Sequence, residues 1–315
     1  MTDPRLVFMG TPDFAVPSLD ALVDAGLAPV AVVTVPDKPA GRGRTLRESA
    51  IKQAAVRHGL PVLQPESLRD PDFQRDLAAL APDILAVVAF RILPREVYET
   101  ARLGAFNLHG SLLPAYRGAA PINRALMDGA TETGVTTFFL KATVDTGDVI
   151  LRERIAVGPD ETAGEVHDRL AEVGAAAVVE TVRRIASGTA EALPQDDALA
   201  SPAPKIFREH AVIDWHRPAR AVHDHVRALS PYPGAWTAWN GETLKILRTA
   251  VVEESARLGA SGTVTEAEGR LVVACAEGAL EVLEAQRQGK RRMAVGDFLR
   301  GADVQPGTIL GSRDV

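Results

Sequence analysis

The sequence is poor in cysteine and contains no long hydrophobic run. Its single cysteine, Cys275, excludes an intramolecular disulfide and any metal site built from several cysteines. No apolar run reaches about 18 residues, so we expect no membrane span. A strand-like stretch, residues 6–9, follows the first residues directly, where a signal peptide would need a basic and then an apolar region. We therefore expect a cytoplasmic protein that binds no metal.

The sequence also has no excess of positive charge, which argues against a DNA-binding protein. The net charge is −6: residues 205–315 hold 15 Lys and Arg against 14 Asp and Glu, and residues 1–204 hold 20 against 27. Neither part is a basic surface of the kind that binds DNA through its phosphates. The best local candidate for RNA contact is segment 38–52, with five cations against Glu48 alone. A solvated surface loop is the alternative interpretation of that segment.

A dinucleotide-binding fingerprint is absent as well. Such a site needs Gly-x-Gly-x-x-Gly directly after the first strand, so that backbone amides can approach the pyrophosphate. Here the turn reads Gly10-Thr-Pro-Asp-Phe14, with one glycine and with a proline among the residues that would have to supply amides. The sequence therefore argues against an NAD-type cofactor.

Short apolar runs alternate with helical patterns over the first 190 residues. The runs are typical of strands buried on both faces of a mostly parallel sheet. They lie at residues 5–9, 30–35, 83–89, 105–109, 135–140 and 149–155. The helical patterns lie at residues 15–25, 49–58, 73–81, 94–101, 121–127 and 162–187. Thr162 and Glu165 form a capping-box pair before the last helix, and Gly188 ends it. This alternation predicts a Rossmann-like α/β domain over residues 1–188.

The rest of the chain has a different pattern. Residues 189–205 lack periodicity and are rich in Pro, Ala and Asp, which predicts a linker. Residues 206–315 contain one helical pattern, at 219–229, followed by five short strand-like runs. These runs lie at residues 235–239, 243–252, 262–265, 271–276 and 279–286. The pattern predicts a smaller, OB-like β-barrel domain. Within it we expect Trp215, Trp236, Trp239 and Cys275 to be core residues rather than ligand contacts.

Polar residues with the functions that acyl transfer needs occur where predicted strands end. Asn107 and His109 are two apart on one strand and therefore share a face, and Asp145 lies on the turn after the next strand. In open α/β sheets, ligands bind at the carboxyl ends of the strands. Asn107 and His109 could hold a developing oxyanion, and Asp145 could accept protons directly or through water. Taken singly, each residue is also compatible with a purely structural role.

The residues around this constellation resemble the folate-dependent formyltransferases. The longest match is residues 106–122 (FNLHGSLLPAYRGAAPI). Further matches are residues 8–18 (FMGTPDFAVPS), 36–44 (PDKPAGRGR), 132–136 (ETGVT), 145–148 (DTGD), 213–215 (IDW) and 231–234 (PYPG). The resemblance therefore covers nearly the whole chain, and within the family it is strongest to members that act on an aminoacyl-tRNA.

The resemblance implies a reaction and a site. The formyl donor would be 10-formyltetrahydrofolate, and the acceptor would be the α-amino group of methionine on initiator tRNA. Asn107, His109 and Asp145 fall on the family's catalytic triad. The folate would contact the loop residues Ser111, Leu112, Leu113, Pro114, Phe90 and Ile92. Around Phe90 the chain departs from the family pattern, because it is one residue shorter and has Arg91 near the position of the usual glycine, so the folate pocket wall differs there.

The resemblance also implies RNA contacts. Arg42 and Arg44 could make bidentate contacts with phosphates or bases. The full set of predicted tRNA-binding residues is Lys38, Arg42, Arg44, Lys205, Lys290 and Arg291. We expect a monomer that binds neither DNA nor a membrane. Two alternatives remain at this stage: a formyltransferase acting on an amino-sugar nucleotide, and a non-catalytic RNA-binding barrel protein.

Overall fold

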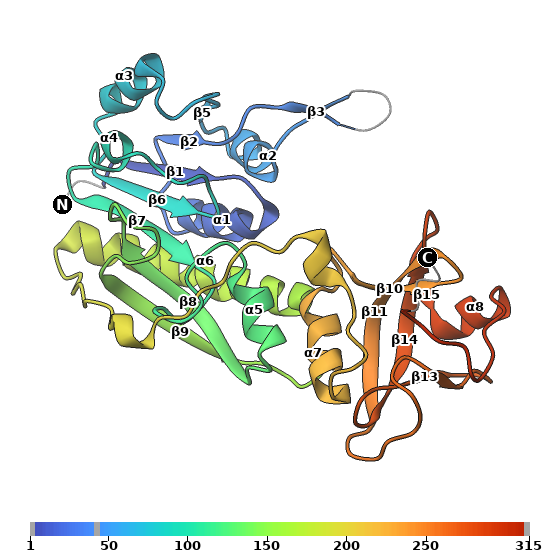
Figure 1. The fold of residues 1–315 in the computed structure, drawn as a ribbon. Helices are drawn as coiled ribbons and strands as arrows, with labels where there is room; N and C mark the ends of the chain where they lie inside the picture. The colour runs from blue at the N-terminus through green and yellow to red at the C-terminus, as the bar shows by residue number, and fades with distance from the viewer. Residues whose placement is uncertain (1–3, 41–44, 312–315) are drawn as a thin grey trace. The chain divides into compact units, whose positions relative to one another are not determined.

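The computed structural model describes residues 4–40 and 45–311, which divide into two compact units (Figure 1). Unit 1 consists of Met1–Ala119, Thr133–Ile155 and His167–Ala203. Unit 2 consists of Ala120–Glu132, Ala156–Val166 and Pro204–Val315. Two short segments that precede residue 188 therefore group with the C-terminal part of the chain. Of the described helices, none is both long and apolar enough to cross a membrane.

Unit 1 is built on a seven-stranded sheet in the order β5-β2-β1-β6-β7-β8-β9. Its strands are β1 (Leu6–Gly10), β2 (Ala31–Val33), β5 (Val62–Leu63), β6 (Ile84–Val88), β7 (Gly104–His109), β8 (Glu132–Phe139) and β9 (Val149–Ala156). The pairs from β5 to β7 are parallel, and β8 is antiparallel to β7. The predicted Rossmann-like, mostly parallel sheet is confirmed, and the short strand β5 is an addition to the six predicted strands.

The six helices predicted before residue 190 are all present. They are α1 (Val16–Asp24), α2 (Ala50–Arg57), α3 (Pro71–Ala79), α4 (Arg95–Tyr98), α5 (Pro121–Met127) and α6 (Ala163–Ser187). The capping box of α6 is confirmed: Thr162 N–H donates to Glu165 Oε2 over 2.8 Å, and Glu165 N–H donates to Thr162 Oγ1 over 3.3 Å. Gly188 ends the helix with φ of +73°. Glycine adopts this conformation without a steric clash because it has no side chain.

The two faces of this sheet pack against different helices. On one face Val7, Leu85 and Val87 form a buried cluster with Leu77 of α3 and Val97 of α4. On the other face α6 lies directly on β7 and β8. A Cβ on Gly174 would come within 2.7 Å of Leu108, and the Thr137 and Thr181 hydroxyls are 2.8 Å apart. Because side chains alternate along a strand, Asn107 and His109 point away from α6.

A hairpin that periodicity does not reveal follows β2. Strands β3 (Lys38–Ala40) and β4 (Thr45–Arg47) pair antiparallel, with Lys38 opposite Arg47. The predicted RNA-contact residues Arg42 and Arg44 lie outside the described residues. Lys38 is exposed on the described part of the hairpin.

Residues 189–203, which make up most of the predicted linker 189–205, pack onto unit 1. Leu193 pairs with Val149 of β9, and Arg117 N–H donates to Ser201 O over 2.8 Å. A short 3₁₀ turn, η2 (Asp197–Leu199), lies between these contacts. We call residues 193–203 the strap. It crosses the loop that leaves β7 and contributes to the site described below.

Unit 2 contains an antiparallel sheet in the order β10-β11-β14-β13-β12, with β15 beside β14. Its elements are η3 (Arg208–Ala211), α7 (Ala219–Ala228), β10 (Ala235–Trp239), β11 (Glu242–Glu253), β12 (Val264–Glu266), β13 (Leu271–Ala274), β14 (Ala279–Arg287), β15 (Met293–Ala294) and α8 (Val295–Arg300). The five predicted strands and the predicted helix are present. Together they form an antiparallel half-barrel, which confirms the predicted OB-like class.

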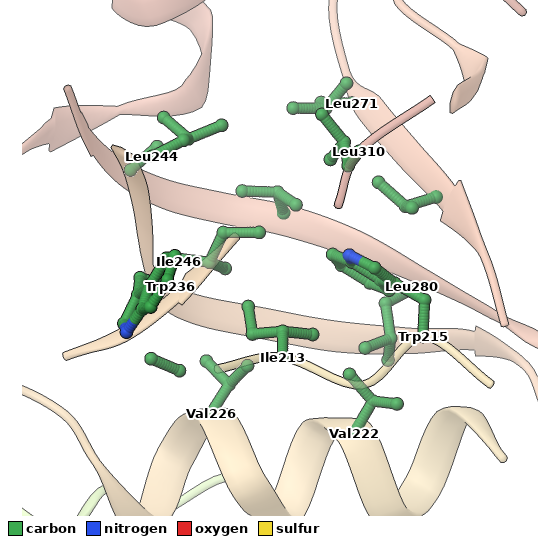
Figure 2. Close-up of a cluster of buried hydrophobic side chains, with 14 of the residues drawn as sticks. Ile213, Trp215, Val222, Val226, Trp236, Leu244, Ile246, Leu271, Leu280 and Leu310 are labelled. Atoms are coloured by element: carbon green, nitrogen blue, oxygen red, sulfur yellow. The ribbon is translucent and has the colours of Figure 1, made fainter. Parts of the chain in front are cut away.

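The core of unit 2 lies between α7 and the sheet. Figure 2 shows Val222 and Val226 of α7 directed toward Ile213, Trp215 and other apolar side chains of the sheet and loops. Trp215, Trp236 and Trp239 are each at most 9% exposed, and Cys275 is fully buried. These four residues are core residues, as predicted.

Candidate active site

The site begins where β7 ends. Asn107 pairs with Val87 of β6 and with Phe138 of β8, and His109 pairs with Thr136 of β8, so both backbone positions are held in the sheet. His109 is only 6% exposed, whereas Asn107 is partly exposed. Within the described part of the chain, no group hydrogen-bonds to the Asn107 carboxamide. This amide is therefore available to a ligand at the strand end.

The imidazole of His109 is held between a backbone carbonyl and a carboxylate. Its Nε2 lies 2.8 Å from the carbonyl oxygen of Tyr116, and its Nδ1 lies 3.8 Å from Oδ2 of Asp145. Because a carbonyl oxygen only accepts, Nε2 carries the proton in this arrangement. The second nitrogen, Nδ1, is thereby left on the side of Asp145. The ring is oriented so that a proton can be taken up or released at Nδ1.

Asp145 lies beside His109 because of the path of the chain after β8, and not because β8 ends there. Because β8 is antiparallel to β7, its last residue, Phe139, lies beside Phe106 rather than beside His109. Residues 140–148 return toward the carboxyl end of β7, which brings the carboxylate to the imidazole. Gly147 permits this close return, since a Cβ there would lie 1.6 Å from the carbonyl oxygen of Phe139.

The turn holds Asp145 in an uncommon backbone conformation. Its φ is +57°, in the left-handed region that aspartate tolerates better than most residues. Oδ2 accepts a hydrogen bond of 2.9 Å from the backbone N–H of Gly118. The side chain is only 10% exposed. Non-glycine residues with positive φ cluster at functional sites, where neighbouring contacts offset a strain of about 1–3 kcal/mol.

The predicted folate segment is a tight turn fastened to β8. The Ser111 hydroxyl is buried and donates to Ala115 O over 2.6 Å, so it is not free for a ligand. The Thr136 hydroxyl donates to Ser111 O and accepts from Leu113 N–H. Leu113 is buried, while Leu112 and Pro114 are partly exposed. Leu112 and Pro114 are thus the side chains of this segment that a ligand could reach.

A second loop leaves the sheet at the same edge, because β6 and β7 are parallel neighbours. It contains Phe90, which is partly buried, and Ile92, whose side chain is 76% exposed. Arg91, the departure from the family pattern, donates to Pro65 O and to Glu66 O over 3.0 Å each. Its guanidinium also lies 5.2 Å from the Phe90 ring centroid. Arg91 therefore anchors this loop to the segment after β5.

One cation of the basic segment 38–52 is already paired. Lys52 forms ion pairs with Asp37 and, over 3.0 Å, with Glu48. The hydrogen bond to Asp37 raises the pKa of Lys52, and the same contact lowers the pKa of Asp37. Lys38 and Arg47 on the hairpin strands remain exposed. Any RNA contact of this segment would therefore use the hairpin and not Lys52.

The predicted RNA-binding residues of unit 2 are all exposed. They are Lys205, which lies 5.6 Å from the Phe207 ring centroid, and Lys290 and Arg291 on the turn after β14. Sequence reasoning missed a basic groove beside this turn. The groove has a volume of about 380 Å³ and is lined by Arg208, Thr243, Lys245, Gln286, Arg287, Gln288 and Gly289. Its three cations lie on η3, β11 and β14, so no local sequence signal marks them as one cluster.

Two guanidinium groups of this groove lie over aromatic rings. Arg208 lies 5.5 Å from the Trp236 ring centroid, and Arg287 lies 5.2 Å from that of Trp239. Stacking of this kind holds a guanidinium plane in place. Arg287 Nη2 also lies 3.4 Å from Glu242 Oε2, so a bound phosphate would compete with that exposed carboxylate.

Sequence reasoning also missed three groups beside His109 and Asp145. They are the Tyr116 carbonyl, the Gly118 amide and the side chain of Gln195 on the strap. Two of them are backbone groups, which no residue pattern marks, and Gln195 comes from a segment without periodicity. Of the residues described, no group of three or more His, Cys, Asp and Glu could hold a metal ion.

Comparisons with known proteins cover both units. Residues 4–182 match the family described as formyl transferase, and residues 205–303 match the formyl transferase C-terminal domain. The chain is 49% identical to the methionyl-tRNA formyltransferase of Moorella thermoacetica over 98% of its length and 99% of that protein. It is 48% identical to the protein of the same name from Chlorobium phaeovibrioides, over 99% of each chain.

A likeness to solved structures shows the fold. The N-formyltransferase of Helicobacter canadensis, in complex with folinic acid and dTDP-3-aminofucose, aligns with a TM-score of 0.67 at 19% identity. The alignment covers 90% of this chain and 99% of that chain.

Proposed function

Because the chain belongs to the formyl transferase family, we propose that it transfers a formyl group from 10-formyltetrahydrofolate to the α-amino group of methionyl initiator tRNA. This reaction prepares the initiator tRNA for translation initiation. The observation that carries the chemistry is the pairing of His109 with Asp145 at the carboxyl end of β7, beside the available amide of Asn107. The near full-length identity to methionyl-tRNA formyltransferases supports the acceptor.

The proposed reaction is direct attack of the amine on the carried formyl carbon. The C–N bond forms, the carbonyl oxygen becomes an oxyanion, and the bond from that carbon to N10 of the folate then breaks. Asn107 Nδ2 and the His109 imidazole stabilise the oxyanion, where one well-placed donor contributes about 3–4 kcal/mol. No covalent intermediate on the protein is needed, so no serine or cysteine nucleophile is required.

Asp145 completes the proton transfers. The attacking amine loses a proton, which Asp145 accepts directly or through water and then returns, again directly or through water, to N10 of the departing folate. General acid–base catalysis of this kind contributes about 10²–10⁴-fold. The Asp145 carboxylate lies 3.8 Å from Nδ1 of His109, and Tyr116 O, which accepts from Nε2, keeps the ring oriented.

We place the folate at the two loops that leave β6 and β7. Leu112, Pro114 and Phe90 offer apolar surface at this edge, and Ile92 is exposed toward solvent. Backbone groups of the segment from Ser111 to Leu113 would supply the polar contacts, since the Ser111 hydroxyl is already used.

We assign RNA contact to two places, one in each part of the chain. Residues 1–188 form the proposed catalytic domain, in which Lys38, Arg42 and Arg44 of the basic segment 38–52 contact the tRNA. Residues 206–315 form the proposed tRNA-holding domain, joined through 189–205. There Lys290, Arg291 and the groove cations accompany Lys205 at the end of the joining segment. The proposed unit is a monomer, and RNA is held by a few cations rather than by net charge.

An acceptor assay tests the proposal. The protein is incubated with 10-formyltetrahydrofolate and, in separate reactions, with charged initiator tRNA or a dTDP-amino sugar, and the formylated product is measured. Formylation of the tRNA alone is expected. Formylation of the sugar nucleotide instead would overturn the acceptor assignment, and no product from either would overturn the enzymatic function.

Variants of the pair test the mechanism. His109→Ala and Asp145→Ala should each lower kcat at least about 100-fold while the protein stays folded. His216→Ala is the matched control, since the His216 side chain is 84% exposed and its aspartate partner, Asp214, is 60% exposed. Activity of either site variant within about threefold of the unaltered protein would overturn the mechanism.

Arg42→Ala tests the RNA assignment. It should raise the KM for tRNA about tenfold, the loss expected for one bidentate contact, and leave the KM for the folate donor unchanged. An unchanged KM for tRNA would remove Arg42 from the proposed RNA-binding residues.

A further inference from the structure

We propose that Gln195 is a positioning residue for the proposed reaction: its carboxamide joins the turn of Asp145 to the loop that holds His109 and thereby sets the distance between the carboxylate and the imidazole. The inference rests on the proposed function. Gln195 lies on the strap, nearly 90 residues along the chain from His109. Among residues 191–200 it alone is not exposed, so its side chain is the one that the strap turns inward.

The amide nitrogen of Gln195 holds the turn of Asp145. Nε2 donates to the carbonyl oxygen of Asp145 over 2.9 Å and to that of Gly147 over 2.8 Å. Both protons of the amide group are used on this one turn. The backbone of Asp145 has φ of +57°, and a conformation of this kind persists where surrounding contacts determine it. Two side-chain hydrogen bonds across the turn are such contacts.

The amide oxygen of Gln195 holds the opposite side. Oε1 accepts from Arg117 Nε over 3.1 Å and from Arg117 Nη2 over 2.7 Å. Arg117 lies between Tyr116, whose carbonyl orients His109, and Gly118, whose N–H donates to Asp145. One side chain therefore fixes both backbone segments whose separation determines how His109 meets Asp145.

A primary amide matches these partners, because it offers two N–H groups on one atom and an acceptor on the other. Carbonyl oxygens accept and a guanidinium donates, so the side chain between them must donate at one atom and accept at the other. A carboxylate would place oxygen against two carbonyls, and an ammonium could not accept from Arg117. This complementarity also fixes which atom of the Gln195 amide is the nitrogen.

The strap holds Gln195 in place from both sides. On one side the backbone of Leu193 pairs with Val149 of β9 in both directions, over 2.8 and 2.9 Å. On the other side Ser201 Oγ accepts from Tyr116 N–H over 2.9 Å, and Ser201 O accepts from Arg117 N–H over 2.8 Å. The backbone on both sides of Gln195 is therefore held by hydrogen bonds to β9 and to the loop after β7.

The first test compares Gln195→Glu with Gln195→Leu. Glu keeps the acceptor for Arg117 but loses both donors to the Asp145 turn. Leu loses all four side-chain hydrogen bonds. Each should lower kcat about 10- to 100-fold, with the KM for tRNA and for 10-formyltetrahydrofolate within about threefold of the unaltered values. Equal tetrahydrofolate dissociation constants and circular dichroism spectra would show that each variant is folded. A kcat within about twofold in both variants would overturn the inference.

Asp197→Asn is the matched control. Asp197 also binds Arg117, over 2.7 Å, but its side chain is 82% exposed and does not touch the Asp145 turn. Its replacement should leave kcat within about twofold, because exposed ion pairs contribute little. A loss equal to that of Gln195→Glu would show that Arg117 alone matters, and this would overturn the role of the Gln195 donors.

A double-variant cycle separates positioning from general structure. In an Asp145→Asn background, Gln195→Glu should reduce single-turnover formylation by no more than about twofold further, because its effect acts through Asp145. If the double variant lost activity by the product of the two single-variant losses, Gln195 would act independently of Asp145. If the unaltered protein formylates neither acceptor, the proposed function fails; activity that is indifferent to Gln195 rejects the inference alone.

Discussion

The backbone N–H of Gly118 and the carboxylate of Asp145 are joined by a hydrogen bond of 2.9 Å, although 27 residues separate them in the chain. The oxygen that accepts it, Oδ2, is the one that faces His109. Gly118 has φ of +128°, and a Cβ there would lie 2.6 Å from the carbonyl oxygen of Ala203 on the strap. The loop, the carboxylate and the strap therefore meet at a position that only glycine fits.

Gly118→Ala should consequently impair both folding and turnover. The added Cβ must displace either the strap or the loop, and a displacement of about 1 Å in a catalytic group costs about 100-fold in kcat. We expect that loss, together with a free energy of unfolding lower by about 1–3 kcal/mol. Steady-state kinetics and urea unfolding measure the two effects. The control is Gly59→Ala, with φ of +65° and no heavy atom within 4 Å of the added Cβ. It should lose about 1–2 kcal/mol of stability without loss of kcat.

Arg91→Ala should weaken binding of the formyl donor. Without the hydrogen bonds to Pro65 O and Glu66 O, the loop of Phe90 and Ile92 loses its anchor. We expect the KM for 10-formyltetrahydrofolate to rise about tenfold, equivalent to about 1.4 kcal/mol, with the KM for tRNA unchanged. Arg95→Ala is the control, since Arg95 makes only an exposed ion pair with Glu99. Equal KM values for 10-formyltetrahydrofolate in the Arg91 variant, the Arg95 variant and the unaltered protein would contradict a role of this loop in folate binding.

His225 should make stability depend on pH. Burial, and then the positive charge of Arg217, lower the pKa of His225 from 6.5 to about 4 in the folded protein. Between these values the unfolded chain binds a proton that the folded protein does not, so stability falls as the pH drops from about 6.5 to about 4. Relative to pH 7, this group destabilises the fold by about 2 kcal/mol at pH 5.

His225→Leu should remove that loss. The free energy of unfolding is measured by urea titration at several pH values. Between pH 7 and pH 5, the drop in this free energy should be about 2 kcal/mol smaller for the variant than for the unaltered protein. His216→Leu, at an exposed position, should keep the original dependence. Parallel curves for the His225 variant and the unaltered protein would contradict the lowered pKa of His225.

Cys275 should be unreactive in the folded protein. It is fully buried in the core of unit 2, and burial raises the pKa of its thiol to about 12. The thiolate is the reactive form, so iodoacetamide at pH 8 should label fewer than about one native chain in twenty. The same protein in concentrated guanidinium chloride should be labelled fully. Native labelling at the denatured rate would show that the thiol is accessible.

Much of the fold follows from local patterns in the sequence. Apolar runs and helical periodicity predict the strands and helices of both parts, since burial on one or two faces leaves a period that a single sequence carries. The capping pair Thr162 and Glu165 marks the start of α6 because its hydrogen bonds are local. The short strand β5 and the hairpin β3–β4 leave no such mark, because their described side chains are exposed or only partly buried and give no apolar pattern.

The sequence by itself determined which side chains stand together on β7, because alternation along a strand puts Asn107 and His109 on one face wherever that strand lies. It did not determine how Asp145 comes to meet them. That depends on β8 being antiparallel to β7, on the return of residues 140–148, and on the strap that crosses the loop carrying Gly118. Strand direction and the path of a nonperiodic segment are fixed by contacts between residues far apart in the chain, so only the tertiary structure decides them.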